Sequence, residues 1–414
     1  MSEIDYKYID LFSGGGGLSE GFISSGFSPI AHVEVDANAC KTLETRLIYH
    51  DLVGQNNLTP YYNYLKGEIT RDFFIQEYGD IGTCNSVLNL CIGEQNDKIF
   101  KLIDERLCCD NLDLIIGGPP CQAYSIVGRA RDANGMKGDI RNLLYKEYAK
   151  FLKRYNPKIF IFENVLGLIT ADKGRYFRNM QSYFKRIGYK LDYSIQKAEK
   201  FGVLQKRKRI VLIGWKKEFD LSYPKFRKVN KTYKIDHLLK DLCQIQPGEK
   251  RIVSTYHSDP SAYLIDFNIR NGVDFVTQHI TRPHNKRDLN IYKIAINKWL
   301  NKGERLKYPD LPSCLKTHKN ETSFTDRFKV IDPHGYSHTM VAHIAKDGHH
   351  YIHPDKKQLR SISVREAARI QSFPDNYYFE GSRTSAFTQI GNAVPPLMAK
   401  EIAIQVKEML CQAN

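Results

Sequence analysis

Hydrophobic and polar positions follow two rhythms in the first half of the chain. Apolar runs of strand length lie at 6–12, 29–35, 112–116, 158–162 and 210–215. Between these runs, apolar residues recur at helical spacing from about Leu18, and again through 144–152 and 176–187. Strands that alternate with helices predict a parallel sheet covered by helices, so we expect an α/β fold.

The pattern changes after Trp215. Alternation weakens there, and Lys, His, Asn and Tyr become frequent until helical spacing returns at Ser361. We therefore expect two domains, because one periodic region is interrupted by one irregular region. The large domain is expected to comprise residues 1–215 and 384–414, with a smaller domain at 216–383 inserted between them.

Composition narrows the setting in which the protein works. No apolar run in the 414 residues is long enough to span a membrane, and the polar N-terminus has no secretion signal. We therefore expect a cytoplasmic protein without a membrane partner. The nine cysteines include no CxxC pair, so neither a disulfide framework nor a zinc site is expected.

Positive charge is concentrated in the irregular region. Of the net charge of +15, residues 216–358 supply most, with 26 Lys and Arg against 16 Asp and Glu. A local basic excess is typical of a surface that binds a polyanion. A solvated basic face is the alternative.

A glycine-rich turn follows the first expected strand. Residues 10–17 have the sequence DLFSGGGG, and such a turn lets the backbone approach a nucleotide-like ligand closely. Glu34, about twenty residues further on, is placed to accept both hydroxyls of a ribose. The two features together predict a cofactor that contains adenosine; the alternative is a tight turn beside a surface acid.

A cysteine stands at the end of another buried strand. Residues 117–125 have the sequence GGPPCQAYS, in which two prolines stiffen the turn before Cys121. A structural cysteine usually lies inside a strand, so this position indicates a reactive thiol. Gly128, Arg129 and Arg131 predict a mobile basic loop that closes over a polyanion.

Two further motifs place charged side chains at strand ends. Glu163 ends an apolar strand in the sequence ENV, where partial burial would raise its pKa and let it donate a proton. A helix-capping acid is the alternative. In QKRKR at 205–209, alternation sends Arg207 and Arg209 to one face, where two guanidinium groups can meet a carbonyl or a phosphate. A charged strand entrance is the alternative.

In this order the motifs resemble those of the DNA cytosine-C5 methyltransferase family of bacterial restriction-modification systems. The matching segments lie at 10–17, 117–122, 163–165, 205–209, 363–375 (SVREAARIQSFPD) and 389–396 (QIGNAVPP). The resemblance implies a Rossmann-like, S-adenosylmethionine-dependent methyltransferase domain with a smaller, irregular target-recognition domain inserted. It also implies a DNA (cytosine-5-)-methyltransferase that flips a cytosine out of double-stranded DNA and releases S-adenosylhomocysteine.

By position, the resemblance also assigns roles to residues. Cys121 resembles the nucleophile that adds to cytosine C6, Glu163 the group that pairs with N3, and Arg209, with Arg207 beside it, the group that holds the base and phosphates. The positions that match cofactor contacts are Phe12, Gly14, Gly16, Gly17, Glu34, Glu68, Ile69, Pro120, Leu144, Asn392 and Val394. The expected DNA contacts are Gln122, Ser125, Arg129, Arg282, Lys286 and Arg287.

Arg282, Lys286 and Arg287 belong to a polar cluster at 281–288, where Arg and Lys can read guanine edges. Phosphate contacts or a solvated loop are the alternatives. This chemistry needs no metal. We further expect a monomer on DNA, associated with the bacterial nucleoid, with a cognate restriction endonuclease as a separately acting partner.

The chain departs from the family pattern in three places. Gly67-Glu68-Ile69 stands where the family usually has Gly-Asp-Ile, and about forty-five residues separate it from GGPPCQ. We expect an insertion at 72–108; the alternative is that Gly79-Asp80-Ile81 is the true motif. Leu204 replaces the usual proline before QKRKR, which we expect to leave catalysis intact.

Two other functions fit parts of the sequence. A C5 methyltransferase that acts on tRNA would resemble this catalytic core, but the long basic region favours DNA. A catalytically silent DNA-binding regulator is a further alternative, against which the intact Cys121 and Glu163 argue.

Overall fold

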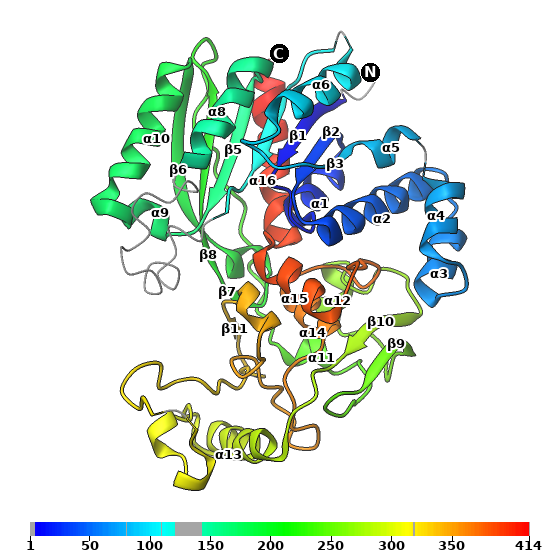
Figure 1. Cartoon of the computed structure of the whole chain (residues 1–414), viewed down its shortest axis with the longest axis vertical. Coiled ribbons are helices and arrows are strands. Elements are labelled where there is room, and N and C mark those ends of the chain that lie inside the picture. Colours follow the sequence, from blue (N-terminus) through cyan, green and yellow to red (C-terminus); the bar gives the residue numbers. More distant parts are fainter. Residues whose placement is uncertain (1–4, 80, 109, 121–142, 318, 414) are drawn as a thin grey trace.

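One seven-stranded sheet organises the larger half of the protein. The structure is a computed structural model that describes residues 5–79, 81–108, 110–120, 143–317 and 319–413. The strands are β1 (Tyr6–Leu11), β2 (Phe27–Glu34), β3 (Val87–Asn89), β4 (Leu114–Gly117), β5 (Ile159–Asn164), β6 (Tyr189–Lys197) and β8 (Lys208–Lys216). Their order is β3-β2-β1-β4-β5-β8-β6 (Figure 1), with β8 antiparallel to both neighbours and the other pairs parallel. The predicted α/β fold is confirmed.

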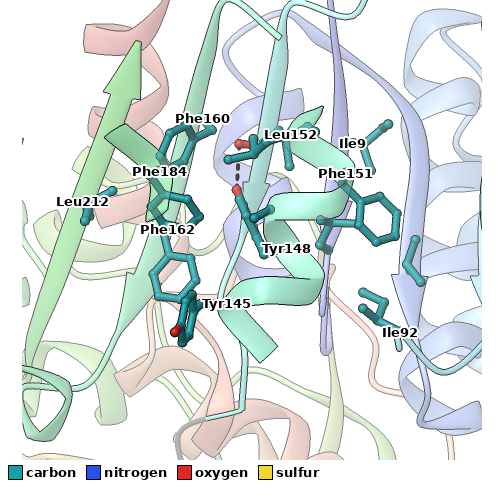
Figure 2. Close-up of a cluster of buried hydrophobic side chains, with 14 of the residues drawn as sticks. Ile9, Ile92, Tyr145, Tyr148, Phe151, Leu152, Phe160, Phe162, Phe184 and Leu212 are labelled. Carbon is teal, nitrogen blue, oxygen red and sulfur yellow. Dashed lines mark hydrogen bonds between the residues drawn. The ribbon is translucent and has the colours of Figure 1, made fainter. Parts of the chain in front are cut away.

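Helices cover both faces of this sheet. One face carries α6 (Asn96–Leu107), α8 (Leu144–Tyr155) and α10 (Arg175–Arg186), and the other carries α1 (Gly17–Ile23) and α16 (Pro396–Gln412). All six residues of β5 are buried, because a strand covered on both sides needs apolar side chains on both. In the core of the first face, Phe160 and Phe162 of β5 lie against Tyr148 and Phe184 (Figure 2).

The smaller, lower unit in Figure 1 has little regular structure. Its elements are β7 (Gln205–Lys206), α11 (Asp236–Leu239), β9 (Lys250–Thr255), α12 (Ala262–Asp266), β10 (Phe275–Ile280), α13 (Lys286–Lys302), β11 (Ser337–His338), α14 (Val364–Ile370) and α15 (Arg383–Asn392). The two strand pairs are an antiparallel β9–β10 and a parallel β7–β11. Its main core includes apolar side chains of α11, α12, α14 and α15.

Short elements complete the chain. Helices α2 (Ala37–Gly54), α3 (Thr59–Lys66), α4 (Arg71–Tyr78) and α5 (Ile81–Asn85) fill the connection between β2 and β3, and α9 (Gly167–Thr170) follows β5. The 3-10 helices span Ala171–Gly174, Ala198–Phe201, Tyr308–Asp310, Ser313–Leu315 and Ala342–Ala345. A helix with the length and apolar character to cross a membrane is not found in the described part of the chain.

The predicted insertion at 72–108 is wrong in its bounds. That range contains β3 and α6, and Leu88, Ile99 and Ile103 from these elements are buried in the core of the main sheet. A segment that supplies a sheet strand and its covering helix belongs to the fold itself. Of the other helices between β2 and β3, α3 lies before residue 72, whereas α4 begins at Arg71 and continues into the predicted range.

Candidate functional site

The expected site residues converge on one edge of the sheet. β1, β2, β4 and β5 run parallel, so the segments that follow them meet at their carboxyl ends. β8 is antiparallel to β5 and pairs Ile210 with Asn164, which brings its first residues to the same edge. This edge faces the smaller unit (Figure 1).

The glycine-rich turn is held open by the acid that ends β2. Phe12, Gly14 and Gly16 have positive φ angles of 61°, 55° and 78°. The amide of Gly14 donates to Glu34 Oε2 at 2.8 Å, so the two features that the sequence singled out are in direct contact. A Cβ on Gly14 would meet none of the described atoms within 4 Å, which leaves space that a ligand can fill.

The C-terminal motif packs on the other side of this turn. A Cβ on Gly17 would lie 2.3 Å from Val394 O, so only glycine permits this approach. Tyr377 Oη donates to Gly15 O at 2.6 Å and fixes the turn from the side of the smaller unit. Asn392 is exposed nearby in sequence, whereas Val394 is buried.

Two residues beside Glu34, Val35 and Asn89, are not among the residues predicted from the sequence. Val35 follows Glu34 directly and is 65% exposed, so an apolar side chain is accessible beside the Glu34 carboxylate. Asn89 ends β3 and donates from Nδ2 to Val35 O at 2.9 Å and to Glu34 O at 3.2 Å. β3 has only three residues, the last of which is Asn89, so its apolar pattern is too short for periodicity to predict a strand.

The expectation for Glu68 and Ile69 is wrong in its structural premise. Gly67 ends helix α3 with φ 76°, so Gly67-Glu68-Ile69 does not follow a strand. Glu68 is exposed and its amide donates to Asn63 O at 2.9 Å, while Ile69 packs in a separate cluster with α3 and α4. The third strand in chain order, β3, ends at Asn89, so the segment that follows Asn89, rather than Gly67-Glu68-Ile69, lies at the carboxyl end of that strand.

Glu163 and Arg209 form a buried ion pair at this edge. Arg209 Nε lies 3.0 Å from Glu163 Oε1, and the two side chains are 12% and 11% exposed. Burial raises the pKa of Glu163, although the charges of Arg209 and Arg207 act in the opposite direction. A Cβ on Gly118 would lie 3.0 Å from Glu163 Oε2, so glycine at this position leaves the carboxyl group uncovered.

Arg207 does not share this role, contrary to the expectation that it faces a ligand. Its side chain is fully buried and donates to Met340 O at 2.6 Å and Ala393 O at 2.8 Å. The alternation that paired it with Arg209 fails because β7 ends at Lys206 and β8 begins at Lys208. Arg207 instead joins the segment around Met340 to the residues that directly follow α15, next to Asn392.

The predicted nucleophile lies outside the described residues, as do three expected DNA contacts. These four residues are Cys121, Gln122, Ser125 and Arg129. The described chain ends at Pro120, which is exposed, and resumes with Leu143 and Leu144 at the start of α8. Asn164 Nδ2 donates to Pro119 O at 3.1 Å, so the end of β5 anchors the turn that leads to the cysteine.

The three expected DNA contacts of the smaller unit, Arg282, Lys286 and Arg287, have different surroundings. Arg282 donates from one terminal nitrogen to Ala345 O at 2.8 Å and Ile344 O at 3.2 Å, so that nitrogen is used within the domain; its role as a DNA contact stays a prediction. Arg287 is paired with Asp288 at 3.2 Å, while Lys286 is exposed at the start of α13. Among the described residues, no three His, Cys, Asp or Glu side chains form a metal-binding cluster.

Comparison with known proteins identifies relatives over nearly the whole chain. The family model for C-5 cytosine-specific DNA methylase matches residues 6–58 and 88–408. The type II methyltransferase M.Bpa9945I of Bacillus paralicheniformis is 42% identical, over 97% of this chain and 98% of its own length. The type II methyltransferase M1.HphI of Haemophilus parahaemolyticus is 28% identical, over 97% of this chain and 87% of its own.

Solved structures share the fold. A prophage-encoded E. coli protein assigned as a DNA modification methyltransferase superposes with a TM-score of 0.66 at 22% identity, covering 98% of this chain and 100% of that one. The Entamoeba histolytica methyltransferase EhMeth gives a TM-score of 0.55 at 13% identity, covering 99% of each chain. At these identities the likeness shows the architecture alone. The family model leaves residues 59–87 unmatched, so the additional segment begins and ends earlier than the sequence analysis placed it.

Proposed function

We propose a residue-level mechanism for this chain, which belongs to the C-5 cytosine-specific DNA methylase family and is a DNA (cytosine-5)-methyltransferase of the restriction-modification type. Its substrate is DNA, and flipping of the target cytosine is the general mechanism of the family. We propose S-adenosylmethionine as the methyl donor and Cys121 as the nucleophile. The observation that carries the proposal is the buried Glu163–Arg209 pair beside the turn that leads to Cys121.

The cofactor proposal rests on the shape of the turn after β1. The open side of Gly14 and the carboxylate of Glu34 provide a cradle and a hydroxyl acceptor for an adenosine ribose. Val35 and Asn89 border the same place, and Val35 offers an exposed apolar surface for a base. The bound cofactor would supply an electrophilic methyl group on a sulfonium centre.

The protein residues make cytosine reactive toward that methyl group. The Cys121 thiolate adds to C6, which shifts the electron pair of the C5–C6 double bond and makes C5 nucleophilic. After C5 has taken the methyl group, loss of the C5 proton and departure of the thiolate restore the aromatic ring. Negative charge on the ring during addition requires a donor near N3.

Glu163 fits the role of that donor. Its raised pKa keeps a larger fraction protonated than an exposed glutamate would have, so it can donate to N3. Arg209 holds the carboxyl group in place, and we assign its guanidinium a contact with the base or its phosphates. Arg207 acts on this reaction as a positioning residue, through the carbonyls of Met340 and Ala393.

The wider assignments belong to the same proposal. We assign residues 216–383 to target recognition, because most of the basic excess lies there. The protein would act as a monomer on double-stranded DNA in the bacterial cytoplasm, with a restriction endonuclease as a separately acting partner.

Covalent trapping tests the mechanism. Bisulfite sequencing of DNA from an expressing host first identifies the methylated sequence. A duplex with 5-fluorocytosine at that position, together with S-adenosylmethionine, should give an adduct that survives denaturing electrophoresis. Cys121→Ala should abolish the adduct, whereas Cys108→Ala, which changes an exposed cysteine elsewhere, should retain it. An adduct that persists in Cys121→Ala would refute the proposed nucleophile.

A further inference from the structure

The segment that the family model leaves unmatched reaches the smaller unit. Its helices α3 and α4 pack on each other through Tyr64 and Phe74, whose rings stack at 4.7 Å and 6°. Figure 1 shows this pair of helices at the far end of α2, beside the antiparallel strands β9 and β10; these two strands, joined by a connection that contains α12, are called the hairpin below. An addition to the large domain thus lies against the domain proposed to read DNA.

Aromatic and cationic contacts join α3 to that hairpin. The rings of Tyr62 and Phe275 meet edge to face at 5.8 Å, and Lys66 Nζ lies 5.0 Å from the centre of the Phe275 ring. Tyr64 also meets Tyr378 at 5.9 Å. These contacts fix the hairpin and the segment 378–380 against the same helix.

Glu380 is the centre of the polar contacts in this region. Its buried carboxylate accepts hydrogen bonds from Tyr64 Oη and Thr45 Oγ1, both at 2.6 Å to Oε1. Arg71 of α4 places Nε at 3.8 Å from the same oxygen and is also paired with Glu44. One carboxylate oxygen is therefore held by α2, α3 and α4 together.

The backbone of Glu380 carries this anchoring to the glycine turn. Its carbonyl accepts from Gln389 Nε2 at 3.0 Å, and its amide donates to Thr42 Oγ1 at 2.8 Å. Thr42 Oγ1 in turn donates to Gln389 Oε1 at 2.7 Å. Gln389 lies directly on Gly15, where an added Cβ would come within 3.1 Å of Gln389 Cβ.

The residue before Glu380 is bound to the recognition side. Phe379 accepts from Gln278 Nε2 at 2.8 Å through its carbonyl and donates to Gln278 Oε1 at 3.0 Å through its amide. Gln278 belongs to β10 and is buried. Two successive residues thus connect the hairpin on one side and the glycine turn on the other.

We infer that helices α3 and α4 form a brace that sets the position of Glu380, and that Tyr64 is a positioning residue for cofactor binding. The brace fixes the β9–β10 hairpin relative to the glycine-rich turn. A change at Tyr64 should therefore shift Glu380 and Gln389, and with them the backbone of Gly15. This inference rests on the proposed function, in which the glycine turn binds S-adenosylmethionine.

Calorimetric titration with S-adenosylhomocysteine tests the inference on the full chain. Tyr64→Phe deletes the hydroxyl but keeps the ring, and its Kd should rise about five- to tenfold, within the usual range of coupling between sites. The control is Tyr62→Phe on the same helix, whose hydroxyl makes no hydrogen bond in the described part of the chain. Its Kd should stay within about twofold of the wild type.

A second variant separates positioning from simple destabilisation. Glu380→Gln should raise the Kd similarly. The double variant Tyr64→Phe/Glu380→Gln should have a Kd no higher than that of the weaker-binding single variant, because both substitutions remove the same contact. In steady state, both variants should raise the KM for S-adenosylmethionine with unmethylated bacteriophage DNA while kcat stays nearly constant. Unchanged Kd values in both variants, even with lowered melting temperatures, would overturn the brace. A wild type that fails to bind S-adenosylhomocysteine would instead overturn the proposed function.

Discussion

Replacement of Arg207 by lysine is the sharpest test of how the site is supported. The guanidinium donates to carbonyls of two separate segments, at Met340 and Ala393, and is fully buried. The lysine side chain is shorter than that of arginine, and its ammonium group lacks the planar arrangement of donors, so it cannot donate to both carbonyls at once. Hydrogen bonds to charged groups contribute roughly 1.5–3 kcal/mol each, so the loss of one or two predicts about 2–5 kcal/mol of destabilisation.

Urea unfolding of Arg207→Lys measures this cost. The matched control is Lys206→Ala, which changes an exposed neighbour and should alter stability by no more than about 0.5 kcal/mol. Because the loosened segment carries Asn392, the KM for the methyl donor should rise more than kcat falls. An Arg207→Lys variant of normal stability and normal KM, but with kcat reduced a hundredfold or more in the manner of a lost transition-state contact, would refute the reasoning and place Arg207 on the base itself.

Two further predictions concern the acid and the glycine turn. Glu163→Gln should lower kcat by about 10²–10⁴-fold and should remove the fall in activity at high pH. Burial raises the pKa of Glu163, so the wild type loses its proton donor as pH rises through that pKa. A pH profile in which the glutamine variant keeps the same fall in activity would contradict this. Gly14→Ala directs a Cβ into the open space of the turn and should chiefly raise the Kd for S-adenosylhomocysteine. In Gly17→Ala the Cβ would lie 2.3 Å from Val394 O, so this variant should chiefly have a lower melting temperature. Both variants are measured by calorimetric titration and thermal unfolding, and a wild-type Kd for Gly14→Ala would count against the cofactor site.

Local sequence was sufficient where function depends on the residues directly after a strand. The apolar runs predicted β1, β2, β4, β5 and β8, and parallel strands bring the segments after them to one edge regardless of the helices between. The structure accordingly joins Gly14 to Glu34 and Glu163 to Arg209, although these partners are 20 and 46 residues apart. Their side-chain chemistry could be proposed from position alone.

Sequence reasoning failed where the backbone departs from periodicity. Alternation predicts a ligand-facing Arg207 only along one continuous strand, whereas β7 ends at Lys206 and β8 begins at Lys208. Glu68 was chosen because Gly-Glu-Ile imitates a family motif, but Gly67 is the left-handed residue that ends α3. The real third strand has only three residues, too few for any period to be measured.

The protonation state of Glu163 depends on the balance between its surroundings. Arg209 at 3.0 Å alone would favour the carboxylate, yet burial outweighs it and the pKa is raised. A group in this balance is sensitive to any molecule that enters the site, because a neutral base that displaces water adds to desolvation without adding charge. Entry of the flipped cytosine should therefore raise the pKa of Glu163 further and deliver a protonated donor to N3 when it is needed. Arg209 would then hold the acid in position without depriving it of its proton.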